Sequence, residues 1–288
     1  MTELLVVNQT SLDKPVENNT DVKEVKAVSE ENVNRNTESA MVKSFNLDKT
    51  ALVFGQSEED IGKEFNEFKA LKLFKRVDVD LTSVRDTLVL KQKIDETSKY
   101  GFGNVVVNPR HIKDAKRYLK GRKIGVFAAV CYPYGEELYG VKKYAVKRAV
   151  QEGADGVYLP LSITDLKSGK IELIRRELQK IVKKYKNKKI FVVLEMAELN
   201  FAYAEKLVKL LLKTKIAGIV SGTGNSSVSK PFAGASDLHS LSSGKRTVVA
   251  CSNTEKSRDV VGLFSVADRV FLKNAPKIAK ELKTNLEI

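Results

Sequence analysis

Polar side chains that could do chemistry stand directly after short apolar runs along the sequence. Carboxylates can exchange protons with a substrate, and a lysine amine can attack a carbonyl to form a Schiff base. Hydroxyl and amide groups can hold a ligand by hydrogen bonds. The candidate ligand-binding groups of this kind are Asp78, Asn108, Glu195, Ser221, Thr223, Ser252 and Lys273. Whether they act together depends on whether the runs bring them to one place.

Cysteine and histidine offer little further chemistry. Cys251 follows an apolar run, where a nucleophile could stand, but neither His111 nor His239 is placed as its base. Cysteine is also a common small core residue. With two histidines and no clustered cysteines, the sequence predicts no metal site and no cofactor.

The apolar runs are short, rich in Val and Ile, and bounded by turn residues, which is typical of strands buried on both faces. Helical patterns separate them, so that eight strand–helix units follow one another over roughly 240 residues. The runs span residues 76–81, 104–108, 124–130, 156–161, 190–195, 217–220, 247–250 and 269–272. The order predicts an α/β fold, a (β/α)8 TIM barrel, with an open doubly wound sheet as the alternative.

In such a barrel the functional face lies at the C-terminal ends of the strands. That face would collect the seven groups named above. It would also collect Asp80, Cys131, Tyr132, Tyr158, Ser162, Cys251 and Asn274.

Two helical segments have patterns that predict which side is buried. Over 170–182 the apolar residues Ile171, Ile174, Leu178 and Ile181 form one stripe. Over 139–155 the predicted buried side holds Val141, Tyr144, Ala145 and Ala149. A further helix is predicted over 57–72, before the first strand, with Ser57 as its cap.

Residues 1–46 are polar and lack sustained periodicity, so they predict a disordered tail, with the barrel over 47–288. The net charge is +14, and the tail holds eight acids and five bases, so residues 47–288 carry +17. Much of this is lysine spread over predicted helix surfaces, and the chain has no Trp. We interpret these faces as solvated, which does not favour nucleic-acid binding.

The first residues lack the pattern of a signal peptide, and no apolar run approaches the ~18 residues that span a bilayer. Two cysteines do not make a disulfide framework. The sequence therefore predicts a cytoplasmic protein with no membrane partner.

Several stretches resemble the deoxyribose-phosphate aldolase family. The segment over 91–121, with its "VNP" turn, is similar to that family's helix, second strand and following turn. The segment over 125–159 is similar to its third strand, long helix ending in Gly-Ala-Asp, and fourth strand. The resemblance covers roughly residues 70–275 and is most specific in the middle third.

This resemblance implies a (β/α)8 fold and class I aldolase chemistry, which makes the enzyme a carbon–carbon lyase. In that chemistry a lysine on strand six forms a Schiff base, a second lysine on strand seven lowers its pKa, and an aspartate on strand four assists proton transfer. Aligned with the family, Ser221 and Ala250 stand at the two lysine positions and Tyr158 at the aspartate position. Since a serine cannot form an imine, the alignment predicts that this apparatus is lost.

The sequence therefore favours a barrel without aldolase activity that binds a sugar phosphate, another small anion or a protein partner. The alternative is an active aldolase on a phosphorylated sugar that uses the relocated lysine Lys273. Nucleic-acid binding through the basic helices is a third hypothesis. The sequence leaves open a protein bound through the N-terminal tail and a second copy of the chain.

Overall fold

The computed structural model describes residues 69–226 and 230–285, which belong to one compact unit, Lys49–Ile288. The predicted tail lies outside the described residues, as does most of the helix predicted over 57–72; the chain is helical over 69–74. Within these ranges, no helix is long and apolar enough to cross a bilayer.

Eight parallel strands close into a barrel in which each strand pairs with the next along the chain, and the last pairs with the first. The strands are β1 Val77–Leu81, β2 Asn104–Val107, β3 Gly125–Ala129, β4 Gly156–Pro160, β5 Lys189–Val193, β6 Gly218–Val220, β7 Thr247–Ser252 and β8 Arg269–Leu272. The predicted (β/α)8 barrel is thus confirmed, and the open sheet is excluded. Every predicted apolar run is a strand.

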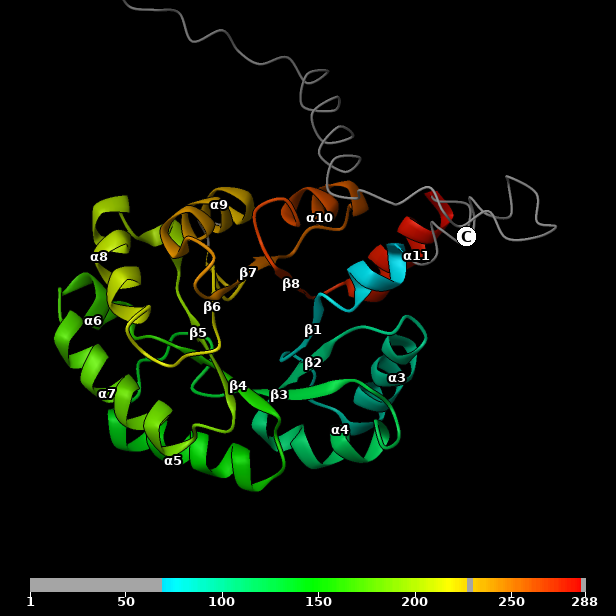
Figure 1. Ribbon diagram of the computed structural model, residues 1–288. Coiled ribbons are helices and arrows are strands. Elements are labelled where there is room, and N and C mark those ends of the chain that lie inside the picture. Colours follow the sequence, from blue (N-terminus) through cyan, green and yellow to red (C-terminus); the bar gives the residue numbers. More distant parts are fainter. Residues whose placement is uncertain (1–68, 227–229, 286–288) are drawn as a thin grey trace, which may run out of the picture. The chain divides into compact units, whose positions relative to one another are not determined.

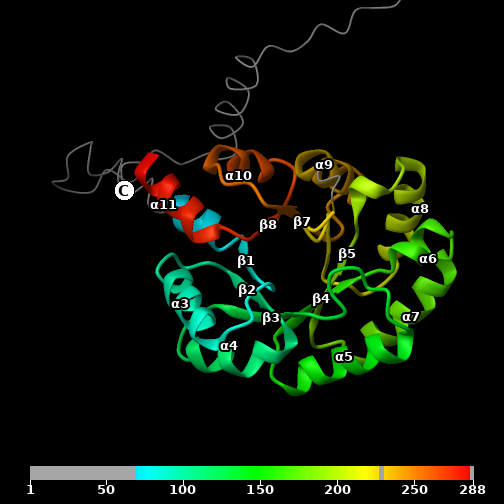
Figure 2. The ribbon, with the colours of Figure 1, turned by 180° about the vertical axis from the view of Figure 1, so that it is seen from behind.

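Helices follow the strands and surround the barrel (Figures 1 and 2). They are α3 Thr87–Ser98, α4 Ile112–Tyr118, α5 Tyr139–Gln151, α6 Ile163–Lys167, α7 Ile171–Lys184, α8 Phe201–Leu211, α9 Pro231–Ser242, α10 Ser257–Leu263 and α11 Ala275–Asn285. Two 3-10 turns, Pro109–His111 and Met196–Glu198, follow β2 and β5.

Alternation along the strands divides the apolar side chains into two clusters. One lies between strands and helices, and it holds Val126 and Ala128 of β3. The other fills the barrel, and it holds Phe127 and Ala129 of the same strand. Four aromatic rings pack edge-on or tilted inside the barrel, with centroids 5.1–6.1 Å apart: Phe127, Tyr158, Phe191 and Phe271.

Helix α7 buries the stripe that its sequence predicts, with Ile174, Leu178 and Ile181 at most 5% exposed. The buried side predicted for α5 is correct for Ala149, which is buried, and for Ala145, which packs against the core, but wrong for the other two residues. Val141 and Tyr144 are 52% and 60% exposed, whereas Lys142 is only 7% exposed and lies beside Val146 and Ala149 on the buried side. A lysine can bury its methylene stem against apolar neighbours, and a pattern that counts it as polar misses this.

Candidate functional site

Two ends of the barrel must be distinguished. The mouth is the end where the strands have their C-termini, and the floor is the end where they have their N-termini. Among the predicted groups, Glu195 and Thr223 meet at the mouth beside Cys251, Tyr132 and Asp80.

Glu195 and Thr223 join the loops after β5 and β6. The carboxylate of Glu195 accepts a hydrogen bond from the backbone N–H of Thr223 at 2.9 Å and another from its hydroxyl. Both side chains are at most 7% exposed. Burial raises the pKa of Glu195, and the hydrogen bonds from Thr223 offset only part of that effect. The loop "GTG" is thereby tied to the end of β5.

Tyr132 and Cys251 occupy the middle of the mouth. The Tyr132 hydroxyl donates to the backbone carbonyl of Thr223, which spans the mouth from the loop after β3 to the loop after β6. Burial raises the pKa of Cys251, and the nearby charges of Asp80 and Glu195 raise it further. A thiol with a raised pKa stays protonated and is a poor nucleophile.

Asp80 is the second carboxylate of the mouth. One of its oxygens accepts a hydrogen bond from the backbone N–H of Thr82 at 2.8 Å. Burial raises the pKa of Asp80, while the bonds from Thr82 and the positive charge of Lys273 lower it by less. Asp80 and Glu195 are thus two carboxyls with raised pKa values, which suits proton exchange.

Lys273 follows β8 and is exposed to solvent. Its ammonium is close enough to Asp80 for its charge to act on that carboxyl. The described residues give it no ion pair within 4.0 Å. It therefore stands at the rim of the mouth rather than inside the barrel.

Asp78 lies deeper, in the barrel interior, and is completely buried. It accepts hydrogen bonds from the Asn104 amide, the Tyr158 hydroxyl and the Arg269 guanidinium. Arg269 begins β8, so this ion pair lies toward the floor. The structure does not bring Asp78 to Glu195, and every donor around its carboxylate comes from the barrel itself.

Tyr158, which the sequence analysis predicts at the family's aspartate position, points into the barrel interior. Burial raises its pKa well above the usual value, and the adjacent Asp78 raises it further. Its hydroxyl is therefore protonated at neutral pH, and it donates to Asp78 at 2.5 Å. A phenol in this state cannot take a proton from a substrate in the way that a carboxylate does.

Ala250 faces the surrounding helices. Ser221 lies at the mouth between α9 and β7, where it lines a small cavity beside Glu195 and its hydroxyl accepts a hydrogen bond from the N–H of Cys251 at 3.0 Å. A Cβ at Gly234 of α9 would lie 3.8 Å from the Cβ of Ser221. Ala250 belongs to the cluster between strands and helices. The neighbouring interior positions are Val220 on β6 and Cys251 on β7. Neither the aligned positions nor these interior neighbours hold a lysine.

The remaining predicted groups support local backbone. Asn108 is exposed, and its side chain caps the 3-10 turn after β2 by accepting from the N–H of Arg110 at 3.1 Å. The Ser252 hydroxyl accepts from the N–H of Thr254 at 3.1 Å. Both predicted ligand-binding residues thus have turn-forming roles in this structure.

The mouth has little room. Its cavity, of about 20 Å³, lies between Glu195, Gly222, Gly224, Lys230 and Cys251, which is space for about one water molecule. Among the described residues, no three His, Cys, Asp or Glu side chains come together as a metal site requires.

Sequence reasoning missed Asn104 and Arg269, the partners of Asp78. The signal was present in the alternation of β8, since Arg269, Phe271 and Lys273 share one side of that strand. Because Phe271 must face the barrel interior, Arg269 must face it too. A buried arginine then requires a carboxylate, and Asp78 is the nearest one on β1.

No family model matches the chain. Comparison with known sequences finds relatives that are named deoxyribose-phosphate aldolase. A deoxyribose-phosphate aldolase of Clostridium botulinum (strain Langeland) is 35% identical over 150 residues, which are 51% of this chain and 69% of the relative. Deoxyribose-phosphate aldolase 1 of Staphylococcus aureus (strain Mu50) is 30% identical over 149 residues, 51% of this chain and 66% of the relative.

Solved structures show the same fold. The deoxyribose phosphate aldolase of Aeropyrum pernix, described as having a unique tetrameric structure, has a TM-score of 0.69 at 20% identity. The match covers 80% of this chain and 100% of the Aeropyrum pernix chain. The structure of an aldolase named QR15 has a TM-score of 0.70 at 22% identity, and the match covers 75% of this chain and 98% of the QR15 chain. At these identities the likeness concerns the fold alone.

Proposed function

Because the chain belongs to the deoxyribose-phosphate aldolase family, we propose that it is a member without Schiff-base chemistry, which acts by binding a sugar phosphate or a protein partner. The observation that carries this proposal is the absence of lysine from β6 and β7 near the mouth. Ser221 lines the mouth cavity, Ala250 faces the helices, and Val220 and Cys251 face the interior. None of these side chains can form an imine.

The state of the other mouth groups supports the same proposal. Tyr158 is a protonated phenol occupied by Asp78, so the proton relay expected of the family has no acceptor at that position. Tyr132 bonds across the mouth to Thr223, and the remaining cavity of about 20 Å³ is far smaller than the several hundred Å³ of a typical ligand site. A sugar phosphate would have to displace this bridge to enter.

Glycines and a cation at the mouth suit a phosphate group. Gly222 and Gly224 lie beside the cavity together with Lys230. Backbone N–H groups of glycine can approach phosphate oxygens closely, and a lysine supplies a compensating charge. Binding without turnover is therefore chemically reasonable for this end of the barrel.

One observation favours the alternative, an active aldolase or lyase that uses Lys273. This amine lies near enough to Asp80 to influence it, and Asp80 has the raised pKa that suits a proton shuttle. An amine that attacks a substrate carbonyl loses two protons, and the carbonyl oxygen leaves as water; Asp80 could carry one of these protons.

Borohydride trapping separates the two proposals. The chain is incubated with acetaldehyde or deoxyribose 5-phosphate, reduced, and analysed by intact and peptide mass spectrometry, beside an active aldolase as positive control. We expect no adduct under conditions that trap the control stoichiometrically. A stoichiometric adduct on Lys273, absent from Lys273→Ala, would instead establish the alternative.

A second copy of the chain is a further proposed partner. Exposed apolar side chains gather at the start of α5, where Leu138 is 81%, Tyr144 60%, Val141 52% and Tyr134 50% exposed. Patches of this kind mark interaction surfaces, and the Aeropyrum pernix relative is described as a tetramer. Sedimentation of the wild type and of Leu138→Lys tests this, since a monomeric wild type would exclude it.

A further inference from the structure

The floor of the barrel, opposite the mouth, is open. The first residues of β6, β7 and β8 and the turns before them enclose a hollow of about 560 Å³. Its lining includes Ala217, Lys245, Arg246, Thr247, Asp268 and Arg269. Small-molecule sites usually measure about 300–1,000 Å³, so this hollow, unlike the mouth, is large enough for a ligand.

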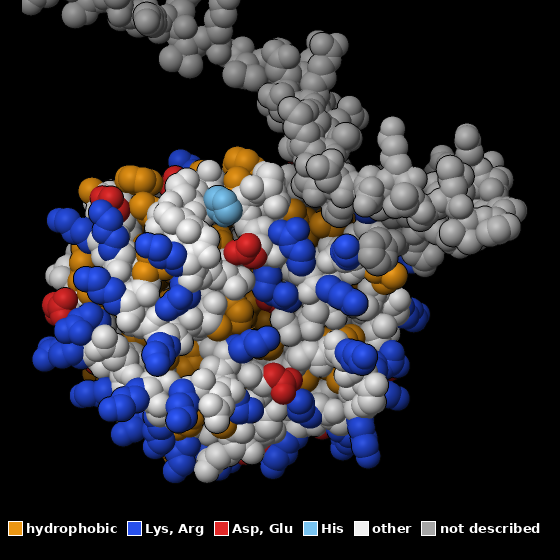
Figure 3. Space-filling view, viewed as in Figure 1, with side chains coloured by type: hydrophobic (Ala, Val, Ile, Leu, Met, Phe, Trp, Pro, Cys, Tyr) orange, Lys and Arg blue, Asp and Glu red, His pale blue; other side chains and the backbone are white. Residues whose placement is uncertain are grey.

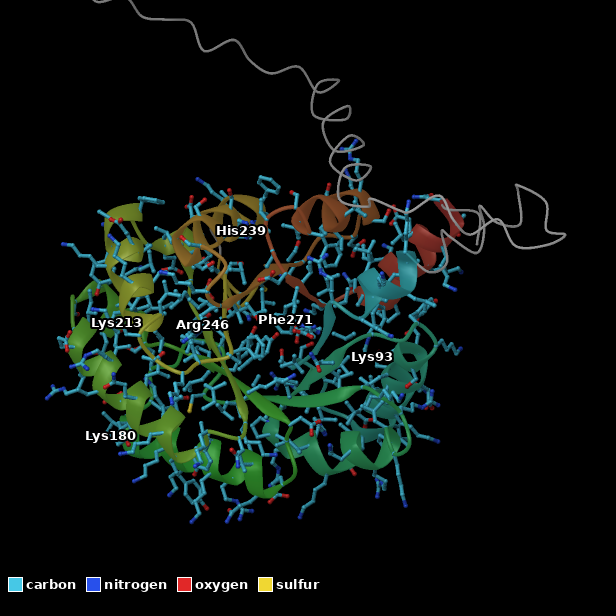
Figure 4. All side chains as sticks on the ribbon, in the orientation of Figure 1. Lys93, Lys180, Lys213, His239, Arg246 and Phe271 are labelled. Atoms are coloured by element: carbon cyan, nitrogen blue, oxygen red, sulfur yellow. The ribbon has the colours of Figure 1, made fainter. Side chains whose placement is uncertain are left out.

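Positive charge dominates the lining of this floor hollow. Lys245, Arg246 and Arg269 line the hollow with one carboxylate, Asp268, and Arg269 is also paired with Asp78 in the barrel interior. That carboxylate already accepts the N–H of Val248 at 2.8 Å. Figure 4 shows Arg246 near the centre of the ring of helices, and in the same orientation lysine and arginine far outnumber acids on the visible face (Figure 3).

The guanidinium of Arg246 is held in place without being neutralised. It donates to the backbone carbonyls of Lys245 at 2.7 Å and Thr214 at 2.6 Å. Its Nε is buried and has no hydrogen-bond partner. No carboxylate among the described residues forms an ion pair with it. Because its partners are neutral carbonyls, Arg246 keeps its full positive charge, and its Nε–H donates no hydrogen bond.

Arg76 repeats this arrangement at the edge of the hollow. It donates to the backbone carbonyls of Ala267 at 2.8 Å and Asp268 at 2.6 Å, and it stacks over the ring of Phe264. Burial lowers the pKa of Arg76, the nearby carboxylate of Asp268 offsets part of this effect, and the charge of Arg269 lowers the pKa further. Together with Lys245, these arginines outnumber the carboxylates of Asp268 and Asp78, so the floor keeps a net positive charge.

We propose that the floor hollow binds a small soluble anion that carries at least two phosphate or carboxylate groups. Lys245 and Arg246 would contact one anionic group, with the Thr247 hydroxyl as a further donor. The other group would meet the part of the Arg269 guanidinium that Asp78 does not occupy, since Asp78 accepts from Nε and Nη2. Charge-assisted bonds of this kind are the strong class of hydrogen bond, and arginine suits the planar recognition of such oxygens. This site is distinct from the mouth and independent of the proposed function there.

A purely structural role accounts for part of the cluster only. Helix C-termini point toward the floor, and basic side chains stabilise the partial negative charge there. Arg246 and Arg76 cap carbonyls in this way. Lys245 is exposed and its amine makes no such bond among the described residues, so capping does not explain it. A nucleic acid is less well matched, because the hollow lining has no aromatic side chain for base stacking.

Calorimetric titration of the full chain with inorganic pyrophosphate, at physiological ionic strength, tests the proposal. We expect one saturable site, weakened about tenfold or more by Lys245→Glu and preserved by Lys245→Arg. The matched control is Lys183→Glu, which makes the same charge change on the exposed surface of α7 and should leave the affinity unchanged. Glu195→Gln at the mouth should leave it unchanged as well.

Three results would overturn the proposal. One is the absence of pyrophosphate binding. Another is equal weakening by Lys245→Glu and Lys183→Glu, because that would show attraction to net charge alone. The third is tight binding of a single-stranded RNA that excludes pyrophosphate and is lost in Lys245→Glu, because the floor would then be part of a nucleic-acid surface.

Discussion

Buried carboxyl groups have different surroundings at the two ends of the barrel. At the mouth, the carboxyls of Asp80 and Glu195 are partly or fully buried without an ion pair among the described residues, and burial raises their pKa values. Toward the floor, Asp78 is more deeply buried but is paired with Arg269 and bonded by two further donors. Burial of an acid therefore has different consequences at the two ends, because only toward the floor do the described residues place a cation in direct contact with the buried acid.

The volumes of the cavities at the two ends also differ. The mouth retains about 20 Å³ and the floor hollow about 560 Å³. TIM-barrel enzymes use the mouth, since the loops there vary without disturbing the strands. In this chain the mouth keeps polar groups but is bridged by Tyr132, and the cations lie at the floor. The difference teaches that a family fold does not by itself fix which end of the barrel meets a ligand.

The largest expected effect comes from breaking the ion pair in the barrel interior. Asp78→Ala leaves the Arg269 guanidinium without its carboxylate, and loss of one partner of a buried pair costs about 3–5 kcal/mol, reduced here because Arg269 keeps 21% exposure. We expect a loss of about 3 kcal/mol in the free energy of unfolding, measured by urea denaturation.

Asp80→Ala is the matched control at the mouth. It removes a carboxyl that has no ion pair and whose burial already disfavours its charge. The free energy of unfolding should change by about 1 kcal/mol or less, the net value of an ordinary hydrogen bond. Equal losses in the two variants would contradict the comparison between the two ends.

The second expected effect is a dependence of stability on pH that arises at the mouth. Asp80 and Glu195 have folded-state pKa values above their unfolded values, so the folded state holds more protons between those values. Their contribution to stability is complete below the unfolded pKa values, about 4, and is lost as pH rises through the folded ones.

Asp80→Asn and Glu195→Gln should each flatten this part of the profile, since an amide does not titrate. Urea denaturation between pH 4 and pH 7 measures the change, and Glu96→Gln, an exposed change on α3, is the control for the loss of one carboxyl. An unchanged slope in both mouth variants would show that their carboxyls are solvated rather than buried.

Most of the fold could be predicted from the sequence because strands buried on both faces give continuous apolar runs. Each run, such as 190–195 for β5 (Lys189–Val193), is correct to within two residues. The error in α5 has a physical cause. Lys142 lies on the buried side with its methylene stem, and Val141 lies on the exposed side. Hydrophobic patterns cannot register such a residue.

The site could be predicted only in part. Glu195 and Thr223 are joined at the mouth and Ser221 lines its cavity, but alignment by letters could not show that Ala250 faces the helices. The direction of a side chain at the end of a strand depends on the register between neighbouring strands, which one sequence does not contain. Arg269 was accessible to reasoning, because alternation with Phe271 places it inside the barrel.

The smallest expected effect tests whether Lys273 belongs to the mouth. Its charge lowers the pKa of Asp80 against the larger effect of burial, so Lys273→Met should raise the pKa of the Asp80 carboxyl further. Titration of ¹³C-labelled aspartate by NMR measures this pKa directly. Lys280→Met, an exposed change on α11, should leave it unchanged. If Lys273→Met also left the Asp80 titration unchanged, Lys273 would lie too far from the mouth to act as a relocated nucleophile. If only Lys273→Met changed the Asp80 titration, a cation would lie close to Asp80 at the mouth. The two ends of the barrel would then differ only in how closely a cation approaches the buried acid.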